Sequence, residues 1–475
     1  MEMSEIEKQE ANDITHSRVG EISEADQRLC GNVVICIEKM LEQLPQVNAK
    51  CSIYRISKEL CEVNRKAYTP QLISIGPIHC GTHKDLIANE PYKLQGFINF
   101  LRRINNNKIE SMEDLLKTGA VNILVEKAHH WVKKARNCYA TPTNMMDIDE
   151  FVMMMLVDAC FVVEFLILKF DCDHPDCKFF QIQDNVDISF YQGIDLHILY
   201  DLIKLENQVP FFLLRNLFNL IPKHDVPMII FSFGDLTHKA LKFRLVRKYE
   251  IDLYKEPKHL VDLLSFYFVP LPLDDMQNKH HGFKNGEEHR WIPPSITELC
   301  EAGVTIKKAE NAKYVTNITF KNGVLEIPPL HIYDEFELML RNMVAFEQIS
   351  AGKKNKYVIQ YVLFMDDLIS TEKDVRLLVE AGVIINQIGG SDKEVSDLFN
   401  NLCKFITAPR SSHFDPIIKD LCDHCNGRWN KAKASLKHNY FNTPWAFISL
   451  FAASLLILLT ILQTIFSAIS AFPSA

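Results

Sequence analysis

The sequence predicts a mainly α-helical globular body with a small β-hairpin, followed by a single C-terminal transmembrane helix. Three observations predict this fold class. Apolar residues recur at helical spacing along much of the chain, and one Asn-Gly dipeptide joins two short runs typical of strands. Residues 438–475 contain no Asp, Glu, Lys or Arg and include a long apolar run, which is typical of a membrane span.

The composition is that of a folded protein without a basic surface. The chain has 475 residues, of which 47% are apolar and 24% charged, as in ordinary globular domains. Its 17 glycines and 20 prolines exclude a collagen-like or Pro/Gly-rich disordered chain. The net charge of −8 predicts no nucleic-acid partner. The 13 scattered cysteines predict reduced thiols on the cytosolic side.

The chain divides into a leader, a body and an anchor. Residues 1–29 carry eight acidic and three basic side chains without an apolar core, which excludes a secretory signal peptide. We therefore predict an acidic, disordered leader over residues 1–45 and a helical body over 46–440. The polar, turn-rich residues 272–292 are a candidate internal boundary of the body. The predicted anchor covers residues 441–475.

Helical periodicity accounts for most of the body. One helix is predicted around an apolar stripe made by Leu94, Phe97, Ile98, Leu101 and Ile104. Met112–Val132 is a weaker candidate, and Leu199–Ile221 is expected to kink or split at Pro210. Two capping-box patterns predict later helix starts, and a third pattern resembles them; these are Ser295 with Glu298, Ser391 with Glu394, and Thr371 with Asp374.

A second apolar run, Phe151–Phe170, has the length of a membrane span but contains Asp158 and Glu164. A charged side chain at the centre of a bilayer costs about 2.5–3.5 kcal/mol on insertion scales. We therefore predict a helix buried in the body instead of a second span.

The predicted hairpin is local and short. Val315–Lys321 and Val324–Ile327 are joined by Asn322-Gly323, the dipeptide that type I′ turns favour. The two prolines Pro328-Pro329 end the second strand.

The C-terminal run Ala446–Phe466 is uncharged and would be about 31 Å long as a helix, close to the thickness of a bilayer core. Thr443-Pro444 is a helix-start pattern, and an aromatic ring at position 445 suits the headgroup level. The anchor is assigned to Trp445, Ala446, Leu450, Leu455, Leu456, Leu458, Leu459, Ile461 and Phe466.

The charges beside this span predict its orientation. Arg428, Lys431, Lys433 and Lys437 precede it, and nothing charged follows, so the positive-inside tendency keeps the N-terminal body in the cytosol. We expect a single-pass, tail-anchored protein of the plasma membrane or an endomembrane. The sequon at Asn317 would then face the cytosol and stay unmodified.

Several blocks of the sequence resemble a plant family defined by domain of unknown function 247 (DUF247). The blocks extend over roughly residues 50–466 and include Cys51–Ile56, Ala67-Tyr68-x-Pro70, Ser74-Ile75-Gly76-Pro77, Leu205–Phe212, Thr297–Val304, Asn322–Leu330, Arg341–Gln348 and Pro444-Trp445-Ala446. Ser57 replaces a usual proline of the family, and Cys80 replaces the second residue of a His-His pair. The resemblance implies a largely helical plant protein with a C-terminal membrane anchor and no established activity. Some grass members are linked to self-incompatibility, which suggests recognition or signalling.

Motifs of the common enzyme classes are missing. The sequence has no GxxxxGK[ST], GxGxxG, GxSxG or HExxH pattern, and we expect no cofactor. Cys422 and Cys425 have the spacing of zinc ligands, but a site needs about four ligands and no second C-x₂-C pair exists. We interpret the two cysteines as neighbours on one helix face and predict no metal site.

A set of charged residues in apolar surroundings is the candidate polar core. It consists of Asp158, Glu164, Asp201, Glu206, Arg341 and Glu347. Raised pKa values would suit the acids to general acid catalysis; buried pairing that fixes helix packing is the favoured alternative. Arg341 is expected to pair with Glu206 or Glu347, and His79 is expected to be a structural residue of a turn.

The favoured function is therefore a membrane-anchored recognition, signalling or scaffolding protein of plants, with the lipid bilayer and an unknown protein as partners. A membrane-tethered enzyme that uses buried carboxylates such as Glu206 or Asp158 is the alternative. A closed pocket that joins these acids to His79 or Arg341 would favour the enzyme, and separate buried pairs would favour the binding protein. A channel of associated spans is third, because Gln463 and Thr464 are too few polar residues to line a pore.

Overall fold

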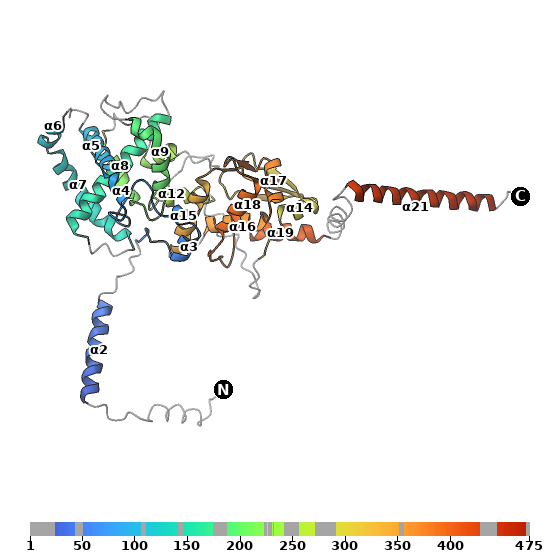
Figure 1. The fold of residues 1–475 in the computed structure, drawn as a ribbon, viewed down its shortest axis with the longest axis horizontal. Coiled ribbons are helices and arrows are strands. Elements are labelled where there is room, and N and C mark those ends of the chain that lie inside the picture. Colours follow the sequence, from blue (N-terminus) through green and yellow to red (C-terminus); the bar gives the residue numbers. More distant parts are fainter. Residues whose placement is uncertain are drawn as a thin grey trace. The chain divides into compact units, whose positions relative to one another are not determined.

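Helices dominate the chain, and short strands complete it (Figure 1). The computed structural model describes residues 24–42, 51–105, 111–140, 146–173, 188–222, 226, 230, 232–241, 256–270, 291–350, 356–427 and 444–471. It divides into two units, Met1–Lys50 and Cys51–Ala475. The mainly helical body with a small sheet is as predicted. The candidate boundary at 272–292 and the basic residues at 428–437 lie almost entirely outside the described residues.

The first unit contains helix α2, Glu24–Glu42, in a segment for which the sequence predicts disorder. Strong helix formers stand at both ends of this helix, EADQRL at residues 24–29 and EKMLE at 38–42, and they support a helix across the β-branched run VVICI. Several apolar side chains of this helix are exposed, including Val33, Val34, Ile37, Met40 and Leu41.

The second unit contains the other helices. They are α3 (Lys58–Val63), α4 (Lys84–Ala88), α5 (Glu90–Ile104), α6 (Met112–Lys117), α7 (Ala120–Ala135), α8 (Ile148–Asp173), α9 (Ile188–Leu202), α10 (Phe211–Phe218), α11 (Phe233–Leu241), α12 (Leu260–Ser265), α14 (Ile296–Glu301), α15 (Phe336–Ile349), α16 (Tyr357–Leu368), α17 (Glu372–Glu380), α18 (Asp392–Leu402), α19 (Asp415–Asn426) and α21 (Pro444–Ala471), with 3₁₀ turns at Arg65–Ala67 and Arg136–Cys138.

Helix α8 is the core helix of the N-terminal half of this unit. Helices α5, α7, α10 and α11 all pack against it. Among the described residues, α8 is the helix long and apolar enough to cross a membrane, over Ile148–Cys172, but 89% of its most apolar window is buried inside the body. The prediction of a buried helix at Phe151–Phe170 is confirmed, and α8 is explained as the core of a folded protein.

Helix α5 forms as predicted, and most of its predicted stripe is covered: Leu101 is buried, and Phe97, Ile98 and Ile104 are partly buried against the core. The most deeply buried face is nevertheless displaced from the centre of the stripe. Leu94 of the predicted stripe is exposed, whereas Lys93, Gly96 and Arg103 are buried. The reason is the contact with α8: a Cβ at Gly96 would lie 2.9 Å from the Phe161 ring, so glycine lets the two helices approach closely. The polar side chains on either side of Gly96 face acids of α8, as described below.

The predicted helix starts hold in three places, with one difference in detail. Ser295 and Thr371 both form capping boxes, at the starts of α14 and α17. Ser391 precedes α18, but its side chain makes no capping hydrogen bond, so the helix start is correct and the capping box is wrong there. The expected break at Pro210 separates α9 from α10.

The strands form two small sheets. The predicted hairpin is present as β2 (Thr319–Lys321) and β3 (Val324–Ile327), antiparallel around Asn322-Gly323, and both turn residues have positive φ, as a type I′ turn requires. Strand β1 (Thr305–Lys308) adds to β3 in parallel, giving the order β1-β3-β2. Strands β4 (Leu330–Ile332) and β5 (Ile384–Asn386) form a separate parallel pair.

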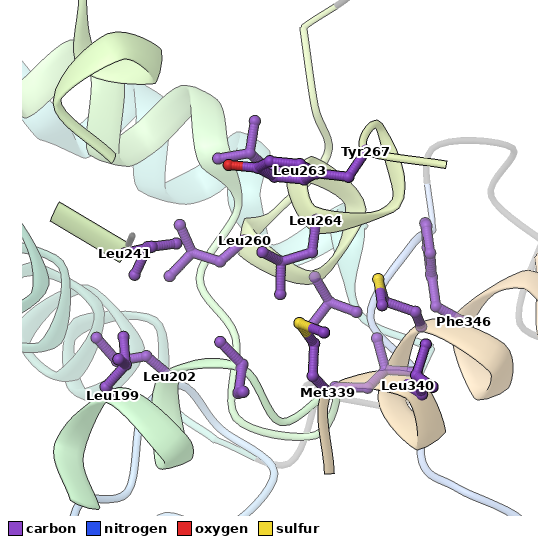
Figure 2. Packing of buried hydrophobic residues seen from close by; sticks show 14 of the residues in the cluster. Leu199, Leu202, Leu241, Leu260, Leu263, Leu264, Tyr267, Met339, Leu340 and Phe346 are labelled. Carbon is purple, nitrogen blue, oxygen red and sulfur yellow. The ribbon is translucent and has the colours of Figure 1, made fainter. Parts of the chain in front are cut away.

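The core of the second unit joins helices that are far apart in the sequence. Figure 2 shows leucines of α12 beside Met339 and Leu340 of α15, with Leu199 and Leu202 of α9 in the same view of the cluster. Helix α15 packs on α12, α16 and α18. The hydrophobic cluster thus connects the N-terminal helices to the C-terminal ones, and the polar segments described next lie within this frame.

Helix α21 covers Pro444–Ala471 and begins at the predicted proline. Within it, Phe451–Ser467 is an apolar helical stretch. All the side chains of α21 that the structure describes are exposed. Among the anchor residues, Leu455, Leu456, Leu458, Leu459, Ile461 and Phe466 are exposed; the side chains of Trp445, Ala446 and Leu450 lie outside the described residues. Among the described residues, the helix that has the length and hydropathy of a membrane span is the internal α8, and the described apolar part of α21 is shorter. A transmembrane role of α21 is therefore a proposal.

Candidate functional site

The candidate polar core is buried throughout. Side chains of Asp158, Glu164, Asp201, Glu206, Arg341 and Glu347 belong to residues that are at most 7% exposed. Burial of unpaired charge is costly, so each of them needs a partner. The partners include an unexpected element, the clamped segment, which we define as residues 69–79. This segment has neither helix nor strand, yet most of it is buried.

Asp201, near the end of α9, accepts hydrogen bonds from three consecutive amides of the clamped segment. The distances are 2.9 Å from Gln71 N, 2.7 Å from Leu72 N and 2.8 Å from Ile73 N. Lys204 Nζ lies 2.9 Å from the same carboxylate and 2.8 Å from Thr69 O. The buried Asp201–Lys204 ion pair thereby supplies the hydrogen bonds that a neighbouring strand would supply to the backbone of residues 69–73 in a sheet.

Asn207 and Gln208 continue the same function after α9. Asn207 accepts from Ile75 N at 2.7 Å and donates to Ile73 O at 2.9 Å, as the neighbouring strand of a sheet would do. Gln208 donates to Leu202 O at 2.6 Å and accepts from Leu260 N at 3.0 Å. The polar run at 206–208 therefore connects α9, α12 and the clamped segment.

Asp158 of α8 holds the middle of the clamped segment. Its carboxylate accepts from Gly76 N at 2.8 Å and from Lys93 Nζ of α5 at 2.7 Å. Lys93 also donates to Ser74 O at 2.9 Å and lies 2.8 Å from Glu90 Oε1. This pair ties α5, α8 and the clamped segment together.

Ionisation of the Lys93–Asp158 pair follows from this geometry. Burial lowers the pKa of the Lys93 ammonium, but the Asp158 and Glu90 carboxylates together outweigh burial, and the pKa of Lys93 is raised above its ordinary value. Burial raises the pKa of Asp158, against the opposing effects of the Lys93 ammonium and the Gly76 amide. The oxygens around Lys93 Nζ therefore keep the amine protonated.

Replacing Gly76 with Ala is expected to destabilise the fold by about 2–4 kcal/mol. Gly76 has a φ of +74°, and a Cβ there would lie 2.8 Å from Gln208 O. Gly81→Ala is the matched control, because Gly81 has a φ of +68° and no atom within 4 Å of its Cβ position. The control should be destabilised only by the strain that the left-handed conformation imposes on alanine, about 1 kcal/mol. Equal midpoints of chemical denaturation for the two variants would contradict this explanation.

Glu206 pairs with a histidine of the clamped segment. Its Oε2 lies 2.7 Å from His79 Nε2, and its Oε1 accepts from Ile56 N at 2.7 Å. Both side chains of the pair are 9% exposed. Because the carboxylate is engaged at both oxygens and fixes the ring, the structural interpretation of His79 is supported.

Glu164 forms the second ion pair between α8 and α5. Arg103 Nε and Nη2 lie 2.6 Å and 2.9 Å from its two carboxylate oxygens, which is the bidentate geometry that arginine favours. The pair lies on the opposite side of Gly96 from Lys93 and Asp158. Two ion pairs and one close glycine contact therefore fix the packing of α5 on α8.

The predicted partners of Arg341 are wrong. Arg341 Nε donates to Glu337 Oε1 at 2.6 Å, one turn earlier on α15. Glu206 is occupied by His79, and Glu347 accepts from Ile359 N at 3.0 Å near the start of α16. A partner four residues away on the same helix is always within reach, whereas the two expected partners meet other groups first.

Tyr68, which lies against Arg341, is expected to make the fold sensitive to alkaline pH. Burial raises its pKa from 10.0 to about 12. A group with a raised folded pKa stabilises the fold fully below its unfolded pKa, and this stabilisation is lost as the pH rises from 10 towards 12. Tyr68→Phe should retain ~2–3 kcal/mol more stability than wild type at the upper end of this window, compared with neutral pH. Midpoints of chemical denaturation, measured for both proteins at neutral and alkaline pH, check this prediction. Equal losses of stability in the two proteins on going to alkaline pH would contradict it.

Several residues of this network were not found from the sequence. Lys93, Arg103, Asn207, Gln208 and Asn342 are all buried. Asn342 of α15 accepts from Leu205 N at 2.8 Å and donates to Ala67 O at 2.7 Å. The available signal was the polar run at 206–208 between apolar stretches, which is unusual unless its side chains are satisfied internally.

Three thiols lie close enough to acids of this network to interact with them electrostatically, namely Cys61 with Glu206, Cys80 with Asp158 and Cys160 with Glu164. The described pockets lie apart from the network. Cys51, Cys61, Cys80, Cys160, Cys422 and Cys425 are free thiols, and Cys422 donates to Ile292 O. Among the described residues, no group of three His, Cys, Asp or Glu side chains is placed to hold a metal. Two open pockets of about 550 and 690 Å³ lie beside the β2–β3 hairpin and between α14 and α17. Neither is lined by a residue of the candidate polar core.

The geometry therefore assigns the buried charges to structure. They are separate pairs and backbone clamps, each saturated by its own partners, and no described pocket brings a substrate to them.

Comparisons with known proteins point to one family. A family model described as "plant protein of unknown function", DUF247, matches residues 53–459. UPF0481 protein At3g47200 of Arabidopsis thaliana is 27% identical over 437 residues, covering 87% of this chain and 85% of the relative. Putative UPF0481 protein At3g02645 of the same plant is 24% identical over 530 residues, covering 93% and 94%. No solved structure matches the chain.

Proposed function

The chain belongs to the DUF247 family of plant proteins, and we propose that it is a membrane-anchored recognition or scaffolding protein without catalytic activity. In this proposal α21 is the anchor, the body of the second unit faces the cytosol, and the bilayer and a protein are its partners. The observation that most supports this proposal is that α21 is apolar, uncharged and exposed.

The composition of α21 supports an anchor. The helix covers 28 residues, about 42 Å at 1.5 Å per residue, and contains no Asp, Glu, Lys or Arg. The hydroxyls of Thr460 and Thr464 donate hydrogen bonds to backbone carbonyls one turn earlier, both at 2.7 Å. These polar atoms therefore need no water. Exposed leucines along such a helix are unfavourable in water and favourable in hydrocarbon.

Charge supports a cytosolic body. Four basic residues precede α21 between 428 and 437, with no acid among them, and no charge follows the helix. The positive-inside tendency retains such a flank on the cytosolic side. The free thiols of the body agree with a reducing compartment.

The saturated polar core supports binding over catalysis. A catalytic acid needs access to substrate and a proton path, whereas Asp201 and Asp158 hold backbone amides of the clamped segment. A rigid body tethered to a bilayer promotes recognition by raising the effective concentration of its surface near membrane-bound partners.

Membrane fractionation with a topology assay tests this proposal. Full-length protein with tags at both ends should resist alkaline carbonate extraction from membranes, and the body should be digested by protease added to intact vesicles. Asn317 should carry no glycan. Removal of residues 444–475 should release the protein into the soluble fraction. A protected, glycosylated body would contradict the orientation, and full carbonate extraction of the intact chain would contradict the anchor.

A further inference from the structure

One loop of the body combines backbone strain, an exposed aromatic ring and local positive charge. Phe405, just after α18, has a φ of +62° and is 58% exposed. A left-handed conformation is unfavourable for a residue with a bulky side chain, and most phenylalanines are buried. A strained residue that is held in place is a reason to look for a role in binding.

The conformation of Phe405 is held by its surroundings. Gln348 of α15 donates a hydrogen bond to Phe405 O at 3.0 Å. The following amide, Ile406 N, donates to Cys403 O at 3.3 Å. Cys403 Sγ lies 3.8 Å from Val362 O of α16. The loop is therefore fixed to two core helices, and this anchoring turns the Phe405 ring towards solvent.

The charge around the ring is positive in an otherwise acidic chain. Lys404 and Arg410 are exposed, and neither has an ion-pair partner among the residues that the structure covers. Residues 403–414 contain no Asp or Glu, whereas the whole chain carries −8. An exposed aromatic ring in a segment whose charged residues are two exposed cations matches a membrane interface, where rings enter the headgroup layer and basic side chains meet anionic lipids.

We propose that Phe405, Lys404 and Arg410 form a second membrane contact, with which the body docks on an anionic lipid surface. This inference rests on the proposed function, because the anchor keeps the body near a bilayer. Residues 427–443 connect α19 to α21 and reach at most about 60 Å when extended. At that effective concentration a weak surface contact is enough to orient the body.

The test is a tryptophan placed at the loop. Full-length F405W is reconstituted into vesicles of phosphatidylcholine with brominated acyl chains, with and without phosphatidylserine, and its fluorescence is compared with that of wild type. We expect the added indole to be quenched in the anionic vesicles. Each basic residue near an anionic surface contributes about five-fold to binding, so adding Lys404→Glu and Arg410→Glu should abolish the quenching.

Val379→Trp on α17 is the matched control, because Val379 is also exposed, at 38%, and should not be quenched. Absence of quenching in F405W, or equal quenching in neutral and anionic vesicles, would overturn the lipid contact. Binding of F405W to an acidic protein without quenching would overturn it as well. Failure of the anchor is distinguishable, because the protein would then not float with the neutral vesicles.

Discussion

Asp201→Ala is expected to remove most of the stability of the fold. The substitution leaves the part-buried amides of Gln71 and Leu72 and the buried amide of Ile73 without an acceptor. It also leaves the Lys204 ammonium without its carboxylate. Each orphaned amide costs about 1–3 kcal/mol, and breaking a buried ion pair costs about 3–5 kcal/mol. The sum reaches the entire stability of a typical domain, about 5–15 kcal/mol. Chemical denaturation and limited proteolysis of the purified variant measure the loss.

Two further variants make this prediction specific to the clamp. Asp195→Ala lies on the same helix and removes the pair of Asp195 with Lys169, in which the acid is 28% exposed; it should cost less than about 1 kcal/mol. Combining Asp201→Ala with Lys204→Met removes the orphaned charge and should recover part of the stability. If Asp195→Ala and Asp201→Ala cost the same, the clamp has no special role.

Two arginines in α21 are expected to abolish membrane integration. Leu456→Arg with Leu459→Arg replaces two exposed apolar side chains in the middle of the helix. On insertion scales each exchange costs about 3–4 kcal/mol, so the pair costs about 6–8 kcal/mol. The variant should move from the carbonate-resistant fraction to the soluble fraction. Leu456→Ala with Leu459→Ala should remain in the membrane.

The body should be unaffected by these anchor variants, because the described side chains of α21 are exposed. An unchanged proteolysis pattern of residues 51–427 would show that the body is intact. Carbonate-resistant membrane association of the double arginine variant would exclude α21 as the anchor and would move attention to other apolar surfaces, such as that of α2.

Local signals in the sequence predicted local structure well. The Asn322-Gly323 turn, the capping residues Ser295 and Thr371, and the break at Pro210 each depend on residues only a few positions apart. The fate of Phe151–Phe170 was also predictable, since Asp158 and Glu164 argue against a span and the structure buries both.

What could not be predicted depends on long-range partners. The apolar stripe on α5 indicated the helix but not the burial of Lys93 and Arg103, because these two side chains meet acids 61–65 residues away. Strands β4 and β5 are three residues each and pair across a separation of 54 residues (Leu330 with Ile384), which leaves no periodic signal. The burial of the acids was predicted; that Asp201 and Asp158 accept hydrogen bonds from amides of the clamped segment was not.

The clamped segment has a consequence for hydrogen exchange. Its amides at Gln71, Leu72, Ile73, Ile75 and Gly76 have no helix or strand around them, and loops of this kind normally exchange with solvent quickly. Here each amide is bonded to a side chain more than 80 residues later in the chain, so local opening cannot release it. These five amides should exchange as slowly as those of α8, through unfolding of the whole body, and a deuterium-labelling experiment would find a loop among its most protected peptides.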